Sequence, residues 1–317
     1  MSTKPGYRSS YKRFIFLLGL IFYFNPAVAD DDISTTDEYS KGARQCMTCH
    51  SEGKDLEAHE IFLTPMGISG AADSPFAEGS HDCETCHGPS ASHRKKQEDG
   101  TRLPPAISFN ANDPVTEQNE VCLSCHTDSM MLSWQGSMHD EEAVACTSCH
   151  AVHVKQDPVL DNLTQQEVCF SCHPRTRAQT FRASSHPLRF GQMTCSDCHN
   201  PHDGNNDFQL IRSTVNDTCY TCHAEKRGPY LWEHAPVTED CSLCHNPHGS
   251  NHPDLLTQRS PLLCQQCHAP GGHPSTAYTS ETAENSFQQR FLLGRSCANC
   301  HSQVHGSNHP SGVTQTR

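Results

Sequence analysis

Hydrophobic positions are unevenly distributed along this chain. A continuous apolar stretch covers residues 14–24, and beyond it apolar residues stand mostly singly or in short groups between polar ones. The best candidate for a longer helix covers residues 281–293, where Ser280 can cap the first turn and Gly294 can end the last. Prolines recur between these segments and predict turns. We therefore expect sparse, short α-helices, mostly loop, and essentially no β-sheet.

The first 29 residues have the layout of a secretory signal peptide. Four basic residues precede the apolar stretch, and a small-residue cleavage pattern follows it: Lys4, Arg8, Lys12 and Arg13, then Ala27-Val28-Ala29. The stretch is shorter than the roughly 20 apolar residues that a membrane-spanning helix needs. We expect residues 1–29 to be removed and residues 30–317 to be exported without a transmembrane segment of their own.

Two polar segments, residues 30–45 and 94–119, are typical of loops. The last residues, 304–317, are polar as well and predict a mobile tail. Short helices are expected elsewhere, around the cysteine motifs described below.

Composition limits the fold further. Only 34% of the 317 residues are hydrophobic, against about 45–50% in an ordinary globular protein. Side chains alone would therefore fill a core poorly, which argues against a large α/β enzyme or a β-barrel. The net charge of −13 becomes −17 once the four basic signal residues are removed. So acidic a chain is not expected to bind nucleic acid.

All 20 cysteines fall into ten C-x-x-C pairs, and a histidine directly follows every pair. We number these motifs 1 to 10 in chain order. The cysteines are Cys46 and Cys49, Cys83 and Cys86, Cys122 and Cys125, Cys146 and Cys149, Cys169 and Cys172, Cys195 and Cys198, Cys219 and Cys222, Cys241 and Cys244, Cys264 and Cys267, and Cys297 and Cys300. The histidines are His50, His87, His126, His150, His173, His199, His223, His245, His268 and His301.

C-x-x-C-H is the attachment signature of c-type haem. Two thiols three residues apart can each add to one haem vinyl group, and the next residue is then held where its imidazole reaches the iron. A disulfide framework or a zinc ribbon also uses paired cysteines. Neither gives a reason for a histidine at one fixed offset in every pair. The sequence therefore predicts ten covalently bound haem c groups.

The remaining histidines match the demand for a second axial ligand. Ten of the 23 histidines close motifs, so thirteen remain. After each odd-numbered motif one of them precedes the next cysteine pair: His59, His139, His186, His234 and His273. Each even-numbered motif is followed closely by another: His93, His153, His202, His248 and His305. We predict bis-histidine iron at all ten sites, with no open coordination position and no catalytic residue.

Three histidines are left over. His252 and His309 belong to two copies of HGSNHP, in which we favour the first histidine as the ligand. His81 competes with His93, and we favour His93. A histidine three residues past a motif is too close along the chain to reach over the same haem, so His153, His202 and His248 should serve neighbouring haems.

Motif spacing leaves no haem-free block of domain size. We expect residues 30–317 to form a single decahaem electron-transfer domain, built from five two-haem repeats with long inserts near both ends. Repeats that cannot bury a core alone become stable by stacking, so the expected architecture is an elongated row of stacked haems.

These motifs resemble those of the MtrA-type periplasmic decahaem cytochromes, the group that includes MtoA-, PioA- and DmsE-like proteins. The matching segments include CMTCH, CETCHGPSASH, CTSCHAVH, CSDCHNPH, CSLCHNPHGS and CANCHSQVH. The resemblance implies a cytochrome that sits inside an outer-membrane β-barrel porin and carries electrons between periplasm and cell exterior. It implies as partners that porin, an extracellular multihaem cytochrome or terminal reductase, and a periplasmic or inner-membrane cytochrome. The expected location is the periplasm, at the outer membrane, in extracellular iron or mineral respiration or in Fe(II) oxidation.

Two other functions were weighed. A soluble periplasmic electron shuttle would carry the same haems without a stable membrane partner. A multihaem reductase would need one iron with an open position, often marked by C-x-x-C-K, and that motif does not occur here. We therefore expect an electron-transfer protein and not an enzyme.

Overall fold

The computed structural model describes residues 37–40, 42–128, 131–204, 206, 208–268 and 296–316. The chain divides into two units, Met1–Thr36 and Asp37–Arg317. The expected signal peptide, the expected helix at 281–293 and His273 lie outside the described residues.

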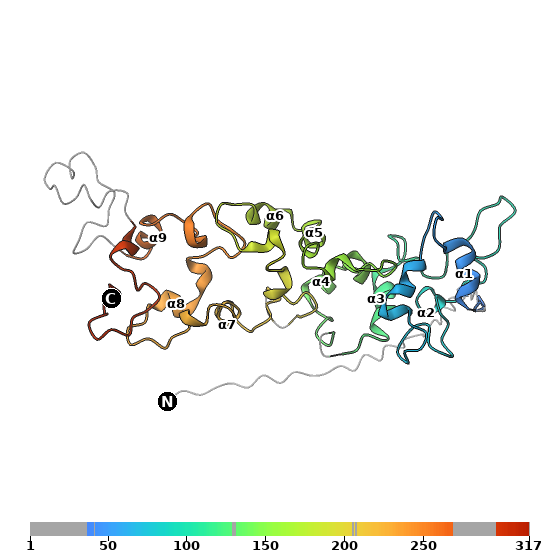
Figure 1. The fold of residues 1–317 in the computed structure, drawn as a ribbon, viewed down its shortest axis with the longest axis horizontal. Helices are drawn as coiled ribbons and strands as arrows, with labels where there is room; N and C mark the ends of the chain where they lie inside the picture. The colour runs from blue at the N-terminus through green and yellow to red at the C-terminus, as the bar shows by residue number, and fades with distance from the viewer. Residues whose placement is uncertain are drawn as a thin grey trace, which may run out of the picture. The chain divides into compact units, whose positions relative to one another are not determined.

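Short helices joined by loops make up the second unit, and the described residues contain no β-strand (Figure 1). The α-helices are α1 (Ala43–His50), α2 (Glu84–His87), α3 (Val115–Leu123), α4 (Met138–Glu141), α5 (Gln165–Phe170), α6 (Pro174–Thr180), α7 (Val215–Tyr220), α8 (Ala235–Glu239) and α9 (Leu262–Gln265). The 3-10 turns are η1 (His59–Leu63), η2 (Pro65–Gly67), η3 (Cys146–Ser148), η4 (Pro158–Leu160), η5 (Pro187–Phe190), η6 (Cys195–Asp197), η7 (Ala224–Lys226), η8 (Cys241–Leu243), η9 (Pro253–Leu255) and η11 (Cys297–Asn299). The prediction of sparse short helices without a sheet is confirmed.

Helix type alternates with motif number. Motifs 1, 3, 5, 7 and 9 begin within α1, α3, α5, α7 and α9, whereas motifs 4, 6, 8 and 10 begin with the 3-10 turns η3, η6, η8 and η11. Motif 2 departs from this alternation, because its residues form the four-residue helix α2. Neighbouring odd and even motifs therefore differ in local backbone structure as well as in their spacing to the next histidine.

The polar loop expected at residues 94–119 is shorter in the structure, because α3 already begins at Val115. Glu117 lies in the first turn of α3, where a negative charge is favourable. The loop expected at 30–45 likewise ends where α1 begins, at Ala43.

The expected mobile tail is instead tied back onto the chain. The backbones of Trp232 and Ser307 exchange hydrogen bonds of 2.8 and 2.9 Å, and the Trp232 indole donates to the His309 carbonyl at 3.0 Å. Gln303 also donates to the Gln315 carbonyl at 2.9 Å. The bonds to Trp232 could not be foreseen from the sequence, because Ser307 and His309 lie about 75 residues away from it.

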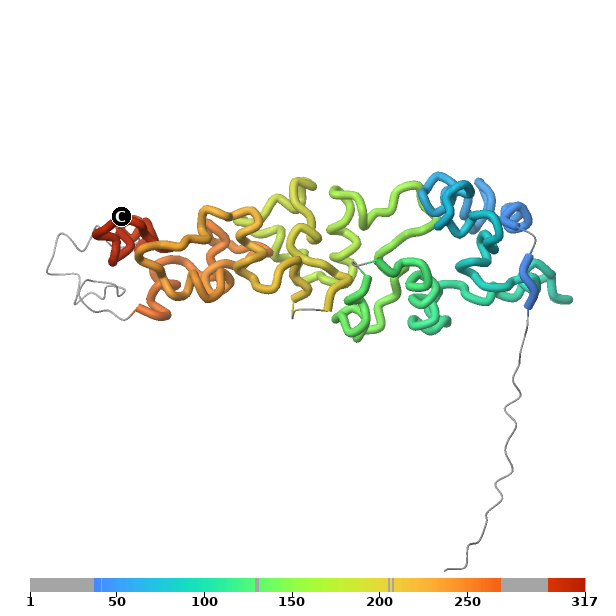
Figure 2. Tube along the Cα trace, turned by 90° about the horizontal axis from the view of Figure 1, so that it is seen from below, coloured from blue at the N-terminus to red at the C-terminus, as the bar shows by residue number. Residues whose placement is uncertain are grey.

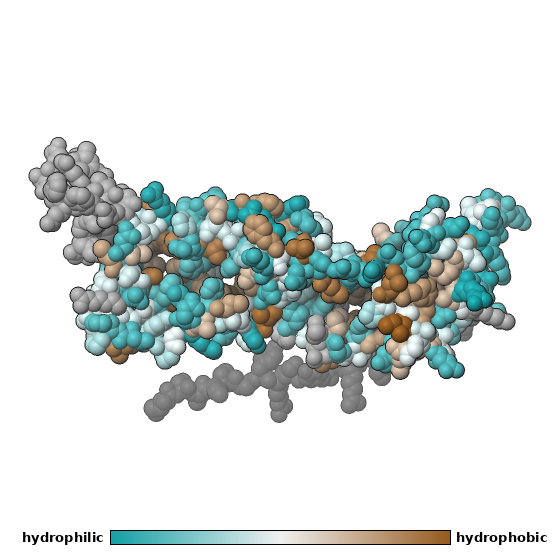
Figure 3. Space-filling model, viewed as in Figure 1, coloured by the Kyte–Doolittle hydropathy of each residue, from teal (hydrophilic) through white to brown (hydrophobic). Residues whose placement is uncertain are grey.

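The polypeptide buries few apolar side chains. Among the described residues the buried hydrophobic ones are Ile61, Phe76, Trp134, Ala145, Phe170 and Leu188. Leu56, Leu132 and Leu160 are each more than 70% exposed, and Figure 3 shows apolar patches scattered over a largely hydrophilic face. The low hydrophobic content thus leaves only a small apolar core, as expected. Hydrogen bonds must therefore position much of the chain.

In two motif pairs an asparagine from the helix of the odd motif holds the following even motif. The buried Asn119 of α3 donates to the Val144 carbonyl at 3.1 Å and accepts from the Cys146 amide at 2.8 Å. Asn216 of α7 repeats this arrangement, donating to the Val237 carbonyl and accepting from the Cys241 amide at 2.7 Å. Each asparagine therefore joins motifs 3 and 4, or 7 and 8, into one unit.

In the other motif pairs, different residues form the hydrogen bonds that join the two motifs. Gln165 accepts from the Ser196 amide at 3.1 Å, between motifs 5 and 6. Ser260 accepts from the Cys297 amide at 3.2 Å, between motifs 9 and 10. Near motifs 1 and 2, Asp82 accepts from the Ala43 amide at 2.7 Å. The trace visits these five motif pairs in chain order (Figure 2).

No helix among the described residues is both long and apolar enough to span a bilayer.

Replacing Asn216 with alanine should destabilise the protein by about 1–3 kcal/mol, because it removes a buried amide that bonds to partly buried backbone groups at Val237 and Cys241. The free energy of unfolding from denaturant titration measures this loss. The exposed Asn162 provides the control, since Asn162→Ala should change it by less than 0.5 kcal/mol, the usual range for surface substitutions. Equal losses in the two variants would contradict the role given to Asn216.

Candidate haem sites

Each motif closes one helical turn. In motifs 2 to 10 the backbone N–H of the histidine donates to the carbonyl oxygen of the first cysteine at 2.9–3.1 Å. The residues of motif 1 form the end of α1. This i to i+4 bond brings the two cysteines and the histidine onto one turn. All 20 cysteines are free thiols, and each is exposed or partly exposed. The local structure therefore suits covalent attachment of a planar group beside the turn.

Among the described residues, eight pairs of imidazole rings lie opposite each other, at interplanar angles from 16° to 77°, and we call them facing pairs. Their centroids lie 5.9–6.5 Å apart, and each pair joins one motif histidine to one histidine from outside the motifs. The pairs are His50 with His93, His87 with His153, His173 with His139, His150 with His202, His223 with His186, His199 with His248, His268 with His234, and His245 with His305.

This separation fits one metal ion between two imidazoles. An imidazole nitrogen binds a first-row metal at about 2 Å and the ring centroid lies about 1 Å further, so two rings on opposite sides of one ion have centroids roughly 6 Å apart. By contrast, the rings of Tyr39 and His81 stack directly at 3.6 Å and leave no such space. The residues present therefore fit the iron of a haem.

Seven of the eight pairs follow one rule of connectivity. His153, His202, His248 and His305, which follow even motifs, each face the histidine of the even motif before. His139, His186 and His234, which follow odd motifs, each face the histidine of the next odd motif. The eighth pair, His50 with His93, lies within the first motif pair. The second to fifth motif pairs thus exchange histidines in both directions with their neighbours, and His153 links the second motif pair to the first. We call this arrangement the reciprocal exchange.

The two exchanged segments also bind each other. His139 Nδ1 lies 3.2 Å from the Pro201 carbonyl oxygen, next to His202. His186 Nδ1 lies 2.9 Å from the Pro247 carbonyl oxygen, and His234 Nδ1 lies 2.9 Å from that of Val304. Each of these hydrogen bonds links the predicted ligand of one site to the backbone next to the predicted ligand of the neighbouring site.

The two copies of HGSNHP add a second connection. Ser250, in the first copy, exchanges backbone hydrogen bonds of 2.8 and 2.9 Å with Ser184. Ser307, in the second copy, does the same with Trp232. Ser184 and Trp232 each lie two residues before a histidine of the reciprocal exchange, so the repeated hexapeptide holds that histidine in position.

Comparison with known proteins identifies the family. The chain is 49% identical over 290 residues to the multiheme cytochrome MtrA of Shewanella baltica (strain OS185), which covers 90% of this chain and 84% of that protein. The chain belongs to the MtrA family of multihaem cytochromes. It is accordingly a c-type cytochrome that binds haem c and transfers electrons, and it is not an enzyme.

Parts of the chain match two broader cytochrome families. The doubled CXXCH motif matches residues 186–228 and 234–273, and the NrfB-like c-type cytochrome family matches residues 83–164. The chain is also 32% identical over 135 residues to the c-type cytochrome NrfB of Escherichia coli O6:H1, covering 41% of this chain and 62% of that protein. Both doubled-motif matches begin at a histidine of the reciprocal exchange, His186 or His234.

At the N-terminal end, His93 and not His81 faces a motif histidine. The His93 and His50 rings are 6.2 Å apart, whereas His81 is stacked on Tyr39. In the HGSNHP copies the first histidine belongs to a facing pair, while His309 accepts a hydrogen bond from Ser311. The axial roles of all twenty predicted histidines stay a prediction.

Hydrogen bonds at Nδ1 set the orientation of these rings. Five motif histidines place Nδ1 at 2.6–2.8 Å from a backbone carbonyl oxygen: His50, His87, His199, His245 and His301. A carbonyl only accepts, so Nδ1 carries the proton and Nε2 keeps its lone pair for a metal. The surrounding backbone therefore selects the tautomer that an iron ligand needs.

Burial also favours the neutral, metal-binding form of four histidines that follow even motifs. Desolvation lowers the pKa of His153, His202, His248 and His305, and nearby histidines lower it further at all four, together with Lys226 at His305. A lowered pKa keeps an imidazole neutral at physiological pH, which is the form that binds metals.

First cysteines of paired motifs also contact each other. A hydrogen bond between Cys46 and Cys83 lowers the pKa of Cys46 to about 7 and raises that of Cys83. Cys122 and Cys146, of motifs 3 and 4, show the same pattern, with the pKa of Cys122 lowered to about 7. The two attachment points within a motif pair are therefore immediate neighbours.

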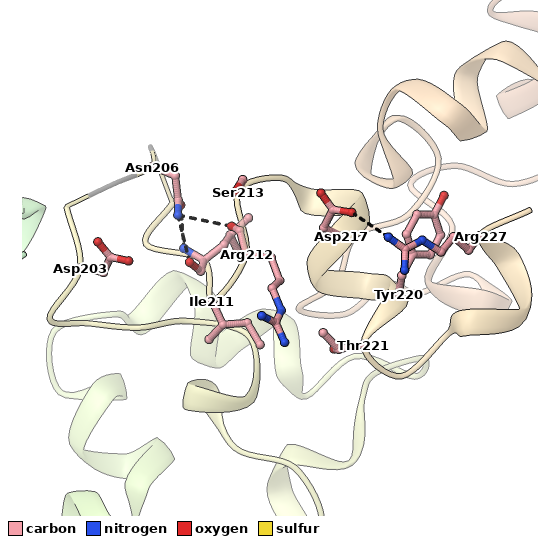
Figure 4. Close-up of a pocket in the computed structure, with 10 residues that line it drawn as sticks. Asp203, Asn206, Ile211, Arg212, Ser213, Asp217, Tyr220, Thr221 and Arg227 are labelled. Atoms are coloured by element: carbon pink, nitrogen blue, oxygen red, sulfur yellow. Dashed lines mark hydrogen bonds and ion pairs between the residues drawn. The ribbon is translucent and has the colours of Figure 1, made fainter. Parts of the chain in front are cut away.

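A pocket of about 760 Å³ opens beside motif 7 (Figure 4). Tyr220 and Thr221, which lie between the two cysteines of the motif, form one side. Arg212 and Arg227 also line it, and Arg227 lies over the Tyr220 ring and pairs with Asp217 at 3.9 Å. The two arginines put positive charge where the carboxylates of a bound haem can be neutralised.

Sequence reasoning missed several positioning residues. Asn119 and Asn216 carry a visible signal, because an asparagine stands three residues before the first cysteine in both motif 3 and motif 7. Asp157 was missed as well, although its carboxylate lies 2.7 Å from His150 Nδ1. Its signal is weak: an aspartate seven residues after the motif, before a proline.

His93→Ala should convert one haem of the protein to a five-coordinate form that binds carbon monoxide when reduced, because His50 would lose the ring that faces it. The carbon monoxide difference spectrum, compared with total haem, measures this. His81→Ala is the matched control and should leave the spectrum unchanged. Carbon monoxide binding in the His81 variant alone would reverse the assignment.

Proposed function

We propose that this cytochrome carries ten bis-histidine haem c groups and passes electrons along them through an outer-membrane β-barrel porin. The electrons would move between a periplasmic or inner-membrane cytochrome and an extracellular multihaem cytochrome or terminal reductase. The observation that carries this proposal is the reciprocal exchange: seven of the eight facing pairs join successive motif pairs, so each motif pair is linked to the next along the chain.

Each haem, when bound, supplies a single-electron Fe(III)/Fe(II) couple. The residues of this chain supply everything else. The two histidines of a facing pair would both bind the iron and would leave it no open position for a substrate. Nδ1 protons are held by carbonyl oxygens, as at His50 and His199, so an electron can pass without a proton leaving the ligand. The exchanged segments fix the spacing of neighbouring sites.

We assign the two remaining sites by extending the same rule. His59 follows motif 1, so it should serve motif 3 and pair with His126. Glu60, next to His59, accepts from the Lys155 amide at 3.0 Å, and Lys155 lies two residues after His153. This contact joins the same two segments that the reciprocal exchange joins elsewhere. His273 is left for His301 in motif 10.

The signal peptide at residues 1–29, the single decahaem domain at 30–317 and the periplasmic location belong to the same proposal. With a net charge of −17, the mature chain should favour basic surfaces on its redox partners. A porin wall would shield this polar chain from lipid, since a closed barrel satisfies its own backbone hydrogen bonds.

Intact-protein mass and the pyridine haemochrome assay should give ten haems per chain. His59→Ala should retain all ten and make one of them bind carbon monoxide, because His126 would lose its partner. His252→Ala is the control and should bind none. A wild-type count below ten, or no carbon monoxide binding in the His59 variant, would contradict the corresponding assignment.

The conduit is tested by purification from outer membranes in mild detergent. A stoichiometric β-barrel should accompany the cytochrome, and the purified complex in liposomes should reduce an internal dye from an external donor. The cytochrome alone should not do so. If it is recovered alone from the soluble periplasmic fraction, the protein is a shuttle and the conduit proposal fails.

A further inference from the structure

Motif 4 differs from the other motifs in what its histidine touches. His150 Nδ1 lies 2.7 Å from a carboxylate oxygen of Asp157, and the aspartate side chain is only 14% exposed. At five other motif histidines Nδ1 faces a backbone carbonyl oxygen instead. In the described part of the chain, His150 is the one motif histidine with a carboxylate at hydrogen-bond distance.

The carboxylate is held in place from several directions. The other Asp157 oxygen accepts from the Ala151 amide at 3.2 Å and from the Val159 amide at 3.3 Å, and Asp157 caps η4. The aspartate is therefore fixed by the turn that follows motif 4, and its contact with His150 does not depend on a freely moving side chain.

His223 shows what a looser arrangement looks like. Its Nδ1 lies 3.7 Å from a Glu225 carboxylate oxygen, which is too long for a hydrogen bond, and both side chains are more than half exposed. On the opposite side of the motif 4 site, His202 Nδ1 is buried and has no hydrogen-bond partner. The carboxylate thus acts on the His150 side alone.

We propose that Asp157 is a positioning residue that lowers the reduction potential of the haem held by His150 and His202. The inference rests on the haem ligation proposed above. A carboxylate that accepts the Nδ1 proton makes the imidazole a stronger electron donor than a carbonyl does. A stronger donor stabilises Fe(III) relative to Fe(II). One electron is exchanged at the iron, and the Nδ1 proton stays between His150 and Asp157 in both oxidation states.

The consequence is one site within the row that is harder to reduce than it would otherwise be. Motif 4 lies inside the row, with motifs on both sides of it along the chain. Placed there, a lowered potential sets the energetic step that electrons must cross in either direction. Among otherwise similar bis-histidine haems, the haem of motif 4 would then have a lower reduction potential than its neighbours.

The test is a redox titration of the full-length holoprotein with Asp157→Asn. Asparagine has the same shape and offers the neutral oxygen that the other motifs present, so one haem in ten should shift to higher potential. We expect about a tenfold change in its one-electron equilibrium, which corresponds to 59 mV. The low-spin ferric electron paramagnetic resonance signal of one haem should change with it.

Two further variants make the result specific. Asp157→Ser keeps an oxygen to cap η4 but places no carboxylate on His150. It should raise the reduction potential of the same haem, and it serves as the test if the asparagine variant fails to fold. Glu225→Gln removes a carboxylate near His223 that makes no hydrogen bond, and it should shift the curve much less.

The outcomes separate this inference from the proposed function. Ten haems retained in Asp157→Asn with a titration that superimposes on wild type would overturn the role of Asp157 and leave the conduit intact. An equal shift in Glu225→Gln would also overturn it, since any nearby charge would then suffice. Fewer than ten haems in the wild-type protein would instead count against the proposed ligation.

Discussion

The proposed bis-histidine iron needs two imidazoles on opposite sides of each haem, and the facing histidine pairs meet that requirement. A histidine next to its own cysteines is fixed by a single turn, but the second histidine cannot come from the same turn. In seven of the eight facing pairs it comes from a neighbouring motif pair, as with His150 and His202, whereas His93 faces His50 within the first motif pair. Each proposed haem site of the reciprocal exchange is therefore also the contact that joins two segments of the chain.

Hydrogen bonds take over the positioning that a hydrophobic core provides in other folds. Few apolar side chains are buried, whereas the buried polar residues include Asn119, Asn216 and Ser307. Each of these bonds to a distant backbone group, and each holds a motif or a histidine of the reciprocal exchange. A buried amide that is fully satisfied specifies one geometry, which suits a protein whose task depends on fixed spacing.

The sites are similar but not equivalent. Five motif histidines donate to carbonyl oxygens, yet His150 donates to a carboxylate. The first motif pair is held by carboxylates, at Asp82 and Glu84, where the third and fifth are held by Gln165 and Ser260. The motifs thus repeat one arrangement but differ in the groups around each proposed haem. Individual haems can therefore differ in reduction potential.

The sequence by itself determined the attachment chemistry, the class of protein and the number of histidines available. The C-x-x-C-H spacing is enough to predict the haem attachment, because it places two thiols and an imidazole on one turn by local geometry alone. It also predicted sparse helices, because the prolines and the low apolar content are local properties. It could not assign His93 over His81 from geometry, or say which motif His202 faces, or foresee that the tail binds Trp232. Those depend on contacts between residues about 40 to 75 positions apart, and a polar chain without a regular hydrophobic period carries no signal for them. Only the tertiary structure decides such pairings, because each is fixed by where two distant backbones meet.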